Sequence, residues 1–118
     1  MNEDAMKART KAFALRVIKL TESLPATRAS DVIGRQLLRS ATSVGANYRE
    51  SWRARSRPDF VNKLGIVEEE ADESSYWLEL LVESGLVPHA KLGDLIRECD
   101  EITAIIVASI QTAKQGRN

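Results

Sequence analysis

The chain has 118 residues, which suits one domain with a single core and leaves no room for a second. Hydrophobic residues make up 43% and charged residues 29%, which is too apolar for a disordered chain, and the 5% aromatic content with only 3 prolines and 6 glycines favours long helices over a many-turned β architecture. The formal net charge is zero, so bulk charge requires no polyanionic partner. We expect one all-α domain over residues 1–118.

Residues from about 3 to 24 are predicted to form the first helix, because apolar side chains recur there at three- and four-residue intervals. This helix is predicted to end at Leu24-Pro25, since the residue before a proline disfavours helical geometry. Ser30 or Asp31 would then cap a second helix over about 31–56. The predicted core stripe of the second helix consists of Ile33, Leu37, Ser40, Val44 and Tyr48.

Small residues lie on one flank of the second helix, at Gly34, Ala41 and Gly45. Glycine is costly inside a helix, so its presence there indicates that another helix approaches closely. A kink or break near Ser43-Val44-Gly45 is the alternative.

Two further helices follow, over about 58–84 and 89–113. Pro58 and Asp59 suit a first helical turn, and Gly85 suits a left-handed helix end. Four amphipathic helices with short connections pack most simply as an antiparallel up-down-up-down four-helix bundle. The third stripe is Phe60, Leu64, Val67, Ala71, Ser74, Leu78 and Leu81, and the fourth is Leu92, Leu95, Ile96, Cys99, Ile102, Ile106, Ser109 and Ile110.

The location of the protein is expected to be cytoplasmic. The N-terminal residues MNEDAMKARTK carry charges where a signal peptide needs an apolar core, and no stretch is apolar enough to cross a membrane. Cys99 lies in an apolar stripe and is the single cysteine, which favours a buried thiol in a reducing compartment.

Charge is unevenly distributed along the chain. Residues 31–57 hold six arginines and two acids, whereas residues 58–86 hold eight acids and one lysine. At about 100° per residue, four of these arginines fall within about 40° of one line opposite the core stripe, with Trp52 beside them. Such a basic ridge suits phosphate and base stacking, although a charged stripe is also typical of any solvated helix. The candidate nucleic-acid-binding residues are Arg35, Arg39, Arg49, Arg53 and Trp52.

The third helix carries a dense cluster of acids whose mutual repulsion needs cations nearby. Arginines of a neighbouring subunit would supply them, giving head-to-tail contacts that close into a ring. Ile66 and Trp77 lie off the core stripe, as residues of an oligomer interface would. An equally weighted alternative is that long charged side chains of the same chain partly cover each of them. The candidate interface residues are Trp52, Ile66, Glu69, Glu73 and Trp77.

No catalytic residue is predicted. The only histidine, His89, precedes the fourth helix, whereas di-iron bundles need Glu-x-x-His repeats on facing helices. Cys99 has no histidine partner on its helix, and neither a phosphate-binding glycine loop nor a nucleophile elbow is present. We therefore expect a protein that is not an enzyme and that binds no metal and no cofactor.

The run from Val32 to Glu50, with Arg-Ser-Ala-Thr-Ser-Val-Gly-Ala-Asn-Tyr at residues 39–48, resembles the signature of one family. That family is the four-helix-bundle proteins named for intervening sequences in bacterial 23S ribosomal RNA. Further matches extend the resemblance over about residues 12–110, at Ser56-x-x-Asp59-Phe60, Lys63-Leu64, Glu70-Ala71-x-Glu73-Ser74 and Tyr76-Trp77-Leu78.

The resemblance implies a homopentamer and no reaction. It also implies kinship with accessory proteins of diversity-generating retroelements, which bind nucleic acid and a reverse transcriptase. The basic surface of the family would map onto Arg35, Arg39, Arg49 and Arg53. Two hypotheses stay open: a homo-oligomer associated with RNA or DNA, and a structural or protein-interaction scaffold in which those arginines meet Glu69 or Glu73 across subunits.

Overall fold

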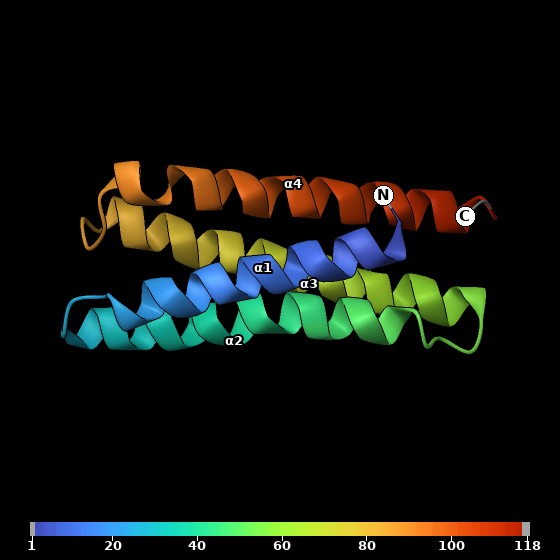
Figure 1. Ribbon diagram of the computed structural model, residues 1–118, viewed down its shortest axis with the longest axis horizontal. Helices are drawn as coiled ribbons and strands as arrows, with labels where there is room; N and C mark the ends of the chain where they lie inside the picture. Colours follow the sequence, from blue (N-terminus) through green and yellow to red (C-terminus); the bar gives the residue numbers. More distant parts are fainter. Residues whose placement is uncertain (1, 117–118) are drawn as a thin grey trace.

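A computed structural model describes residues 2–116 as four antiparallel helices in an elongated bundle of 47 × 22 × 20 Å (Figure 1). The helices are α1 (Glu3–Glu22), α2 (Arg28–Ser51), α3 (Arg57–Glu83) and α4 (His89–Lys114). Consecutive helices pack side by side, whereas α1 and α4 touch over a much smaller region. The expected all-α up-down-up-down bundle is confirmed.

The start of α2 differs from the prediction. The helix begins at Arg28 rather than 31, and its cap is Thr27, whose side-chain oxygen accepts a hydrogen bond from the Ser30 backbone N–H at 3.1 Å. Ser30, one of the two predicted caps, is instead buried. Thr27 has the extended backbone that a cap requires, and Pro25 already separates it from α1. The first helix likewise ends at Glu22 and not at 24.

The end of α2 is also earlier than predicted, at Ser51 instead of 56. The next backbone N–H groups, of Trp52 and Ala54, donate to carbonyls three residues back at 3.3 and 3.2 Å, which tightens the chain into a turn. Ser56 must then be extended, because its hydroxyl caps α3 by accepting from the Asp59 N–H at 3.2 Å. The chain therefore reverses direction between α2 and α3 within residues 52–56, which the helical period had assigned to the second helix.

The core follows the four predicted stripes. Its largest fully buried side chains come from every helix, and Phe13, Leu37, Leu78 and Ile106 are among them. Two of the buried hydroxyls, those of Ser40 on α2 and Ser74 on α3, face each other with their oxygens 2.9 Å apart. Each hydroxyl also reaches a carbonyl of its own helix, which keeps these buried polar groups satisfied.

Helix α1 approaches α2 closely at Gly45. A Cβ added to Gly45 would lie 3.2 Å from the Oγ1 of the fully buried Thr10, so any larger residue here would crowd the Thr10 side chain. The helix α2 runs unbroken through residue 45, which rules out the alternative of a break there. The small residue therefore serves packing, as its position on the flank of the stripe predicts.

Helix α1 is linked to α4 by a group of ion pairs. The guanidinium of Arg9 donates to both carboxylate oxygens of Glu98, at 2.8 and 2.7 Å, and to Glu101 at 2.7 Å. The Arg9 guanidinium holds the pKa of Glu98 below its usual range. The N-terminal end of α1 stops short of the turn between α2 and α3, and α3 and α4 extend beyond it (Figure 1).

Candidate nucleic-acid interface

The predicted basic ridge is divided between paired and unpaired arginines. Arg35 lies 2.6 Å from Asp31 on its own helix. Arg39 pairs with Glu73 and Glu70 of α3, and the hydrogen bond to Glu73 raises the pKa of Arg39. Both arginines are thus neutralised within the chain, and the contact that was expected between Arg39 and an acid of another subunit is made by its own Glu73.

The remaining arginines gather at the turn between α2 and α3. Arg53 lies in this turn and not on the helix, so the prediction that it continues the line of the ridge is wrong. Together with three neighbours it forms a cluster that we call the basic end, consisting of Arg49, Arg53, Arg55 and Arg57. Within residues 2–116, no member of the basic end takes part in an ion pair.

Trp52 lies in the same connecting segment as Arg53 and Arg55, with 41% of its surface exposed. Its ring packs edge-on to Tyr48, with centroids 6.4 Å apart, and against Phe60 of α3 at 5.0 Å. Burial raises the pKa of Tyr48, whose ring forms the inner wall of this group. An exposed aromatic surface accordingly lies in the same segment as the arginines of the basic end, and Arg57 lines a hollow together with Trp52 and Phe60.

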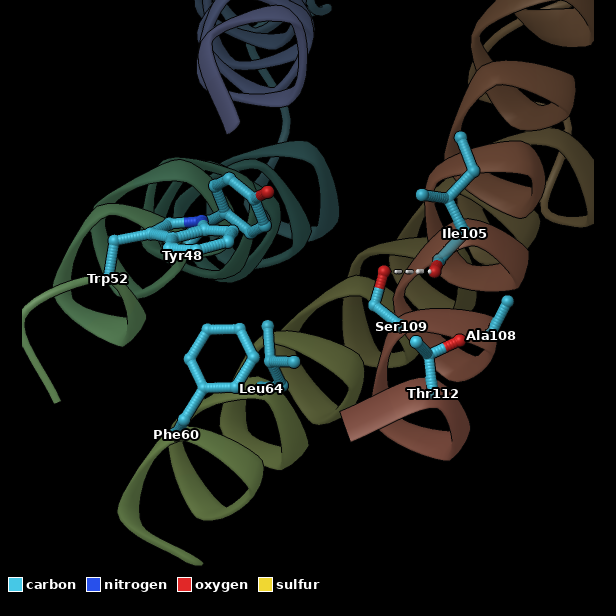
Figure 2. Close-up of a pocket in the computed structure, with 8 residues that line it drawn as sticks. All are labelled: Tyr48, Trp52, Phe60, Leu64, Ile105, Ala108, Ser109 and Thr112. Carbon is cyan, nitrogen blue, oxygen red and sulfur yellow. Dashed lines mark hydrogen bonds between the residues drawn. The ribbon is translucent and has the colours of Figure 1, made fainter. Parts of the chain in front are cut away.

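A pocket of about 390 Å³ opens beside these rings. Figure 2 shows Tyr48, Trp52 and Phe60 on one side of the pocket and residues of α4 on the other. None of its lining residues comes from α1, and at this end of the bundle α3 and α4 extend beyond the N-terminal end of α1 (Figure 1). The complete lining is Tyr48, Trp52, Phe60, Leu64, Ile105, Ala108, Ser109 and Thr112.

Two further hollows connect the aromatic rings to positive charge. The first, of about 260 Å³, shares Trp52 and Phe60 with the aromatic pocket and adds Arg57. The second, of about 400 Å³, shares Arg57 and adds Lys114 from the end of α4. No aspartate or glutamate of the described residues lines any of these three cavities.

The predicted interface residues behave differently from one another. Ile66 is 42% exposed and Glu69 is exposed, as an interface requires. Trp77, in contrast, packs partly buried against the core, and its indole N–H donates to Glu73 at 3.1 Å. This hydrogen bond, more than the contact with Arg39, lowers the pKa of Glu73. Two predicted interface residues thus already have partners within the chain.

Other exposed apolar side chains were not anticipated. Tyr76 is 54% exposed and Leu15 is 59% exposed, and Ile18 and Val32 are also exposed. Tyr76 follows the buried Ser74 by two residues, which places it about 200° around the helix from the core face. Its exposure could therefore have been predicted by applying the helical period to each residue of the third helix.

The residues searched for chemistry lie apart. Cys99 is buried, its thiol donates to the Ala71 carbonyl at 3.2 Å, and burial raises its pKa to about 12. His89 is the exposed first residue of α4. Over residues 2–116, no three side chains of the His, Cys, Asp and Glu types gather in a way that suits a metal ion, and no helix is both long and apolar enough to cross a membrane.

Comparison with known proteins agrees with the architecture. A solved structure from Bacteroides thetaiotaomicron, described as a protein of unknown function from the S23 ribosomal protein family, is 37% identical in sequence and superimposes with a TM-score of 0.88, covering 95% of this chain and all of that one. No curated protein matches the chain significantly. The family model described as 23S rRNA-intervening sequence protein matches residues 4–108. This chain therefore belongs to the 23S rRNA-intervening sequence protein family.

Proposed function

We propose that this protein is a non-enzymatic, homo-oligomeric bundle that associates with RNA or DNA through the basic end. The observation that carries the proposal is the group of arginines at residues 49, 53, 55 and 57, which flank the exposed Trp52 along the chain and form no ion pair among the described residues. Guanidinium groups match phosphate geometry, and aromatic faces accept unpaired bases. The basic end thus takes over the role first assigned to the whole ridge, because Arg35 and Arg39 are neutralised.

Self-association is the second part of the proposal. Exposed apolar side chains on three helices, with Ile66 and Tyr76 on α3 among them, are the kind of surface that a subunit contact covers. A ring of identical subunits, a pentamer as the family resemblance implies, would place several basic ends on one assembly. A cytoplasmic setting is consistent with the lone buried thiol of Cys99.

A salt-dependent gel shift tests the nucleic-acid part. The double variant Arg49→Glu/Arg53→Glu should lose binding to single-stranded RNA, and the wild-type affinity should fall steeply as salt rises, because bound cations are released from the strand. The matched control is Arg28→Glu/Lys91→Glu, which makes the same change in net charge at the other end of the bundle, where α2 and α4 begin. Equal loss in both variants would show that only overall charge matters and would refute the role of the basic end.

The alternative is a scaffold that binds protein and no nucleic acid. It is favoured by the exposed apolar residues, and the pairing of Arg39 with acids of its own α3 leaves that arginine less available to phosphate. Under this alternative, reversing Arg49 and Arg53 lowers the mass of the assembly, measured by light scattering, and the wild-type protein shifts no RNA or DNA. Under the nucleic-acid proposal, the same variant keeps the wild-type mass.

A further inference from the structure

We propose that the aromatic pocket between α2, α3 and α4 holds one unpaired nucleobase of a single-stranded RNA or DNA, while the adjoining phosphates lie against Arg57 and Lys114. This inference rests on the proposed association with nucleic acid, and it goes further by naming the part of the ligand and its position. A pocket with this role reads single strands and not the stacked interior of a duplex.

The walls of the pocket suit a flat, partly polar group. The rings of Trp52 and Phe60 line one side, and the volume of about 390 Å³ lies within the range of small-molecule sites. Two hydroxyl-bearing side chains of α4, Ser109 and Thr112, line the opposite side (Figure 2). The Ser109 hydroxyl donates to its own helix, to the Ile105 carbonyl at 2.8 Å, so its oxygen can still accept a hydrogen bond from the edge of a base.

Cations lie next to the rings and not within the pocket. Trp52 and Phe60 separate the aromatic pocket from the hollow that contains Arg57, and Arg57 in turn borders the hollow that contains Lys114. A strand whose base enters the pocket would place its backbone along these two side chains, with no carboxylate lining the path among the described residues. This alternation of aromatic ring and cation is the arrangement that single-strand binding proteins use.

The pocket also has the position that a strand needs. None of its lining residues comes from α1, and α3 and α4 extend beyond the N-terminal end of α1 at this end of the bundle (Figure 1). A second copy of the chain could instead insert a side chain there, and the experiment below separates these two occupants.

The test compares two probes that carry the same phosphates. One is a single-stranded oligouridylate, and the other is an abasic oligonucleotide of equal length. Ala108→Phe fills the pocket from an exposed position of α4, and Ala104→Phe places the same ring one turn away, outside the pocket lining. We expect Ala108→Phe to weaken oligouridylate binding by about fivefold or more, the loss of one stacked base, with abasic binding unchanged. Ala104→Phe should change neither affinity.

Tryptophan fluorescence gives an independent measurement. Oligouridylate should quench the wild-type emission, the abasic probe should not, and Trp52→Phe should lose the quenching although it retains Trp77. Circular dichroism verifies that each variant is folded.

The possible results separate the two proposals. If the wild-type protein binds neither probe, the association with nucleic acid is wrong and the base pocket falls with it. If both probes bind equally and Ala108→Phe changes nothing, the association stands and the base pocket is refuted. If Ala108→Phe lowers the mass of the assembly while oligouridylate affinity stays the same, the pocket is a contact between subunits and the inference is also refuted.

Discussion

The close packing of α1 on α2 makes a quantitative prediction at Gly45. Replacing a glycine inside a helix by alanine normally stabilises the folded state by about 1 kcal/mol. At Gly45 the new Cβ would lie 3.2 Å from the Thr10 Oγ1 and 3.5 Å from the Thr10 Cβ. Thr10 cannot easily move, since it is fully buried and its hydroxyl donates to the Met6 carbonyl at 2.9 Å. Overpacking of this kind costs about 1–3 kcal/mol, so Gly45→Ala should be destabilising by about 1 kcal/mol.

Gly65 is the matched control for this measurement. It also lies inside a helix, but a Cβ added there has no neighbour within 4 Å. Gly65→Ala should therefore raise the free energy of unfolding by about 1 kcal/mol, the full propensity gain. Both variants are measured by urea unfolding followed by far-UV circular dichroism, at one protein concentration because self-association would add to apparent stability.

A double-mutant cycle identifies the contact responsible. Thr10→Ala removes the nearest atom, so Gly45→Ala should become stabilising, or nearly so, in the Thr10→Ala background. If Gly45→Ala stabilises the wild-type protein as much as Gly65→Ala does, α1 does not approach α2 as closely as the structure has it, and the argument from close packing fails.

Three further predictions concern the buried and half-buried polar groups. Arg9 lowers the folded-state pKa of Glu98, so this pair stabilises the protein at pH values above the unfolded-state pKa, and the stabilisation is lost as the pH falls through the folded-state pKa. Glu98→Gln should therefore lower the free energy of unfolding by about 1–2 kcal/mol at neutral pH. It should also make the free energy of unfolding decrease less in acid, as measured by denaturation at several pH values. Burial raises the pKa of Cys99 to about 12, so iodoacetamide should modify it at neutral pH only after denaturant is added, and rapid labelling of the native protein in mass spectrometry would contradict its burial. Ser74→Ala should lower the free energy of unfolding by about 1 kcal/mol. The double variant with Ser40→Ala should lose less than the sum of the two single variants, because the two hydroxyls share one buried hydrogen bond. Strict additivity of the two losses would show that the hydroxyls do not interact.

The core faces of the helices could be predicted from the sequence. Apolar residues at helical spacing lie on the same side of whatever helix they form, so Leu37, Val44 and Leu78 are buried for reasons that each helix contains in itself. Helix ends were less predictable. The Thr27 cap and the turn after Ser51 depend on a few local hydrogen bonds that competing polar residues also offer.

The candidate site was predictable only in part. An exposed Trp52 beside arginines follows from the order of residues along the chain, and it is found. The neutralisation of Arg39 by Glu73 does not follow, since it depends on which turn of α3 lies beside which turn of α2. The partial burial of Trp77 did not follow from the sequence either. The helical period places Trp77 at the border between the core face and the solvent face of α3, and the packing of the neighbouring helices decides how far it is buried.

What the sequence determined by itself, then, is the set of four amphipathic helices, their stripes and the separation of positive from negative charge, because each of these properties is local to one segment. The tertiary structure alone decided which arginines pair with another helix, as Arg39 does with Glu73, and where the pocket forms. The pocket brings Trp52 together with Thr112, which is distant in the chain, and none of its lining residues comes from α1. The axial alignment of helices results from the packing of the whole core, so no single segment encodes it.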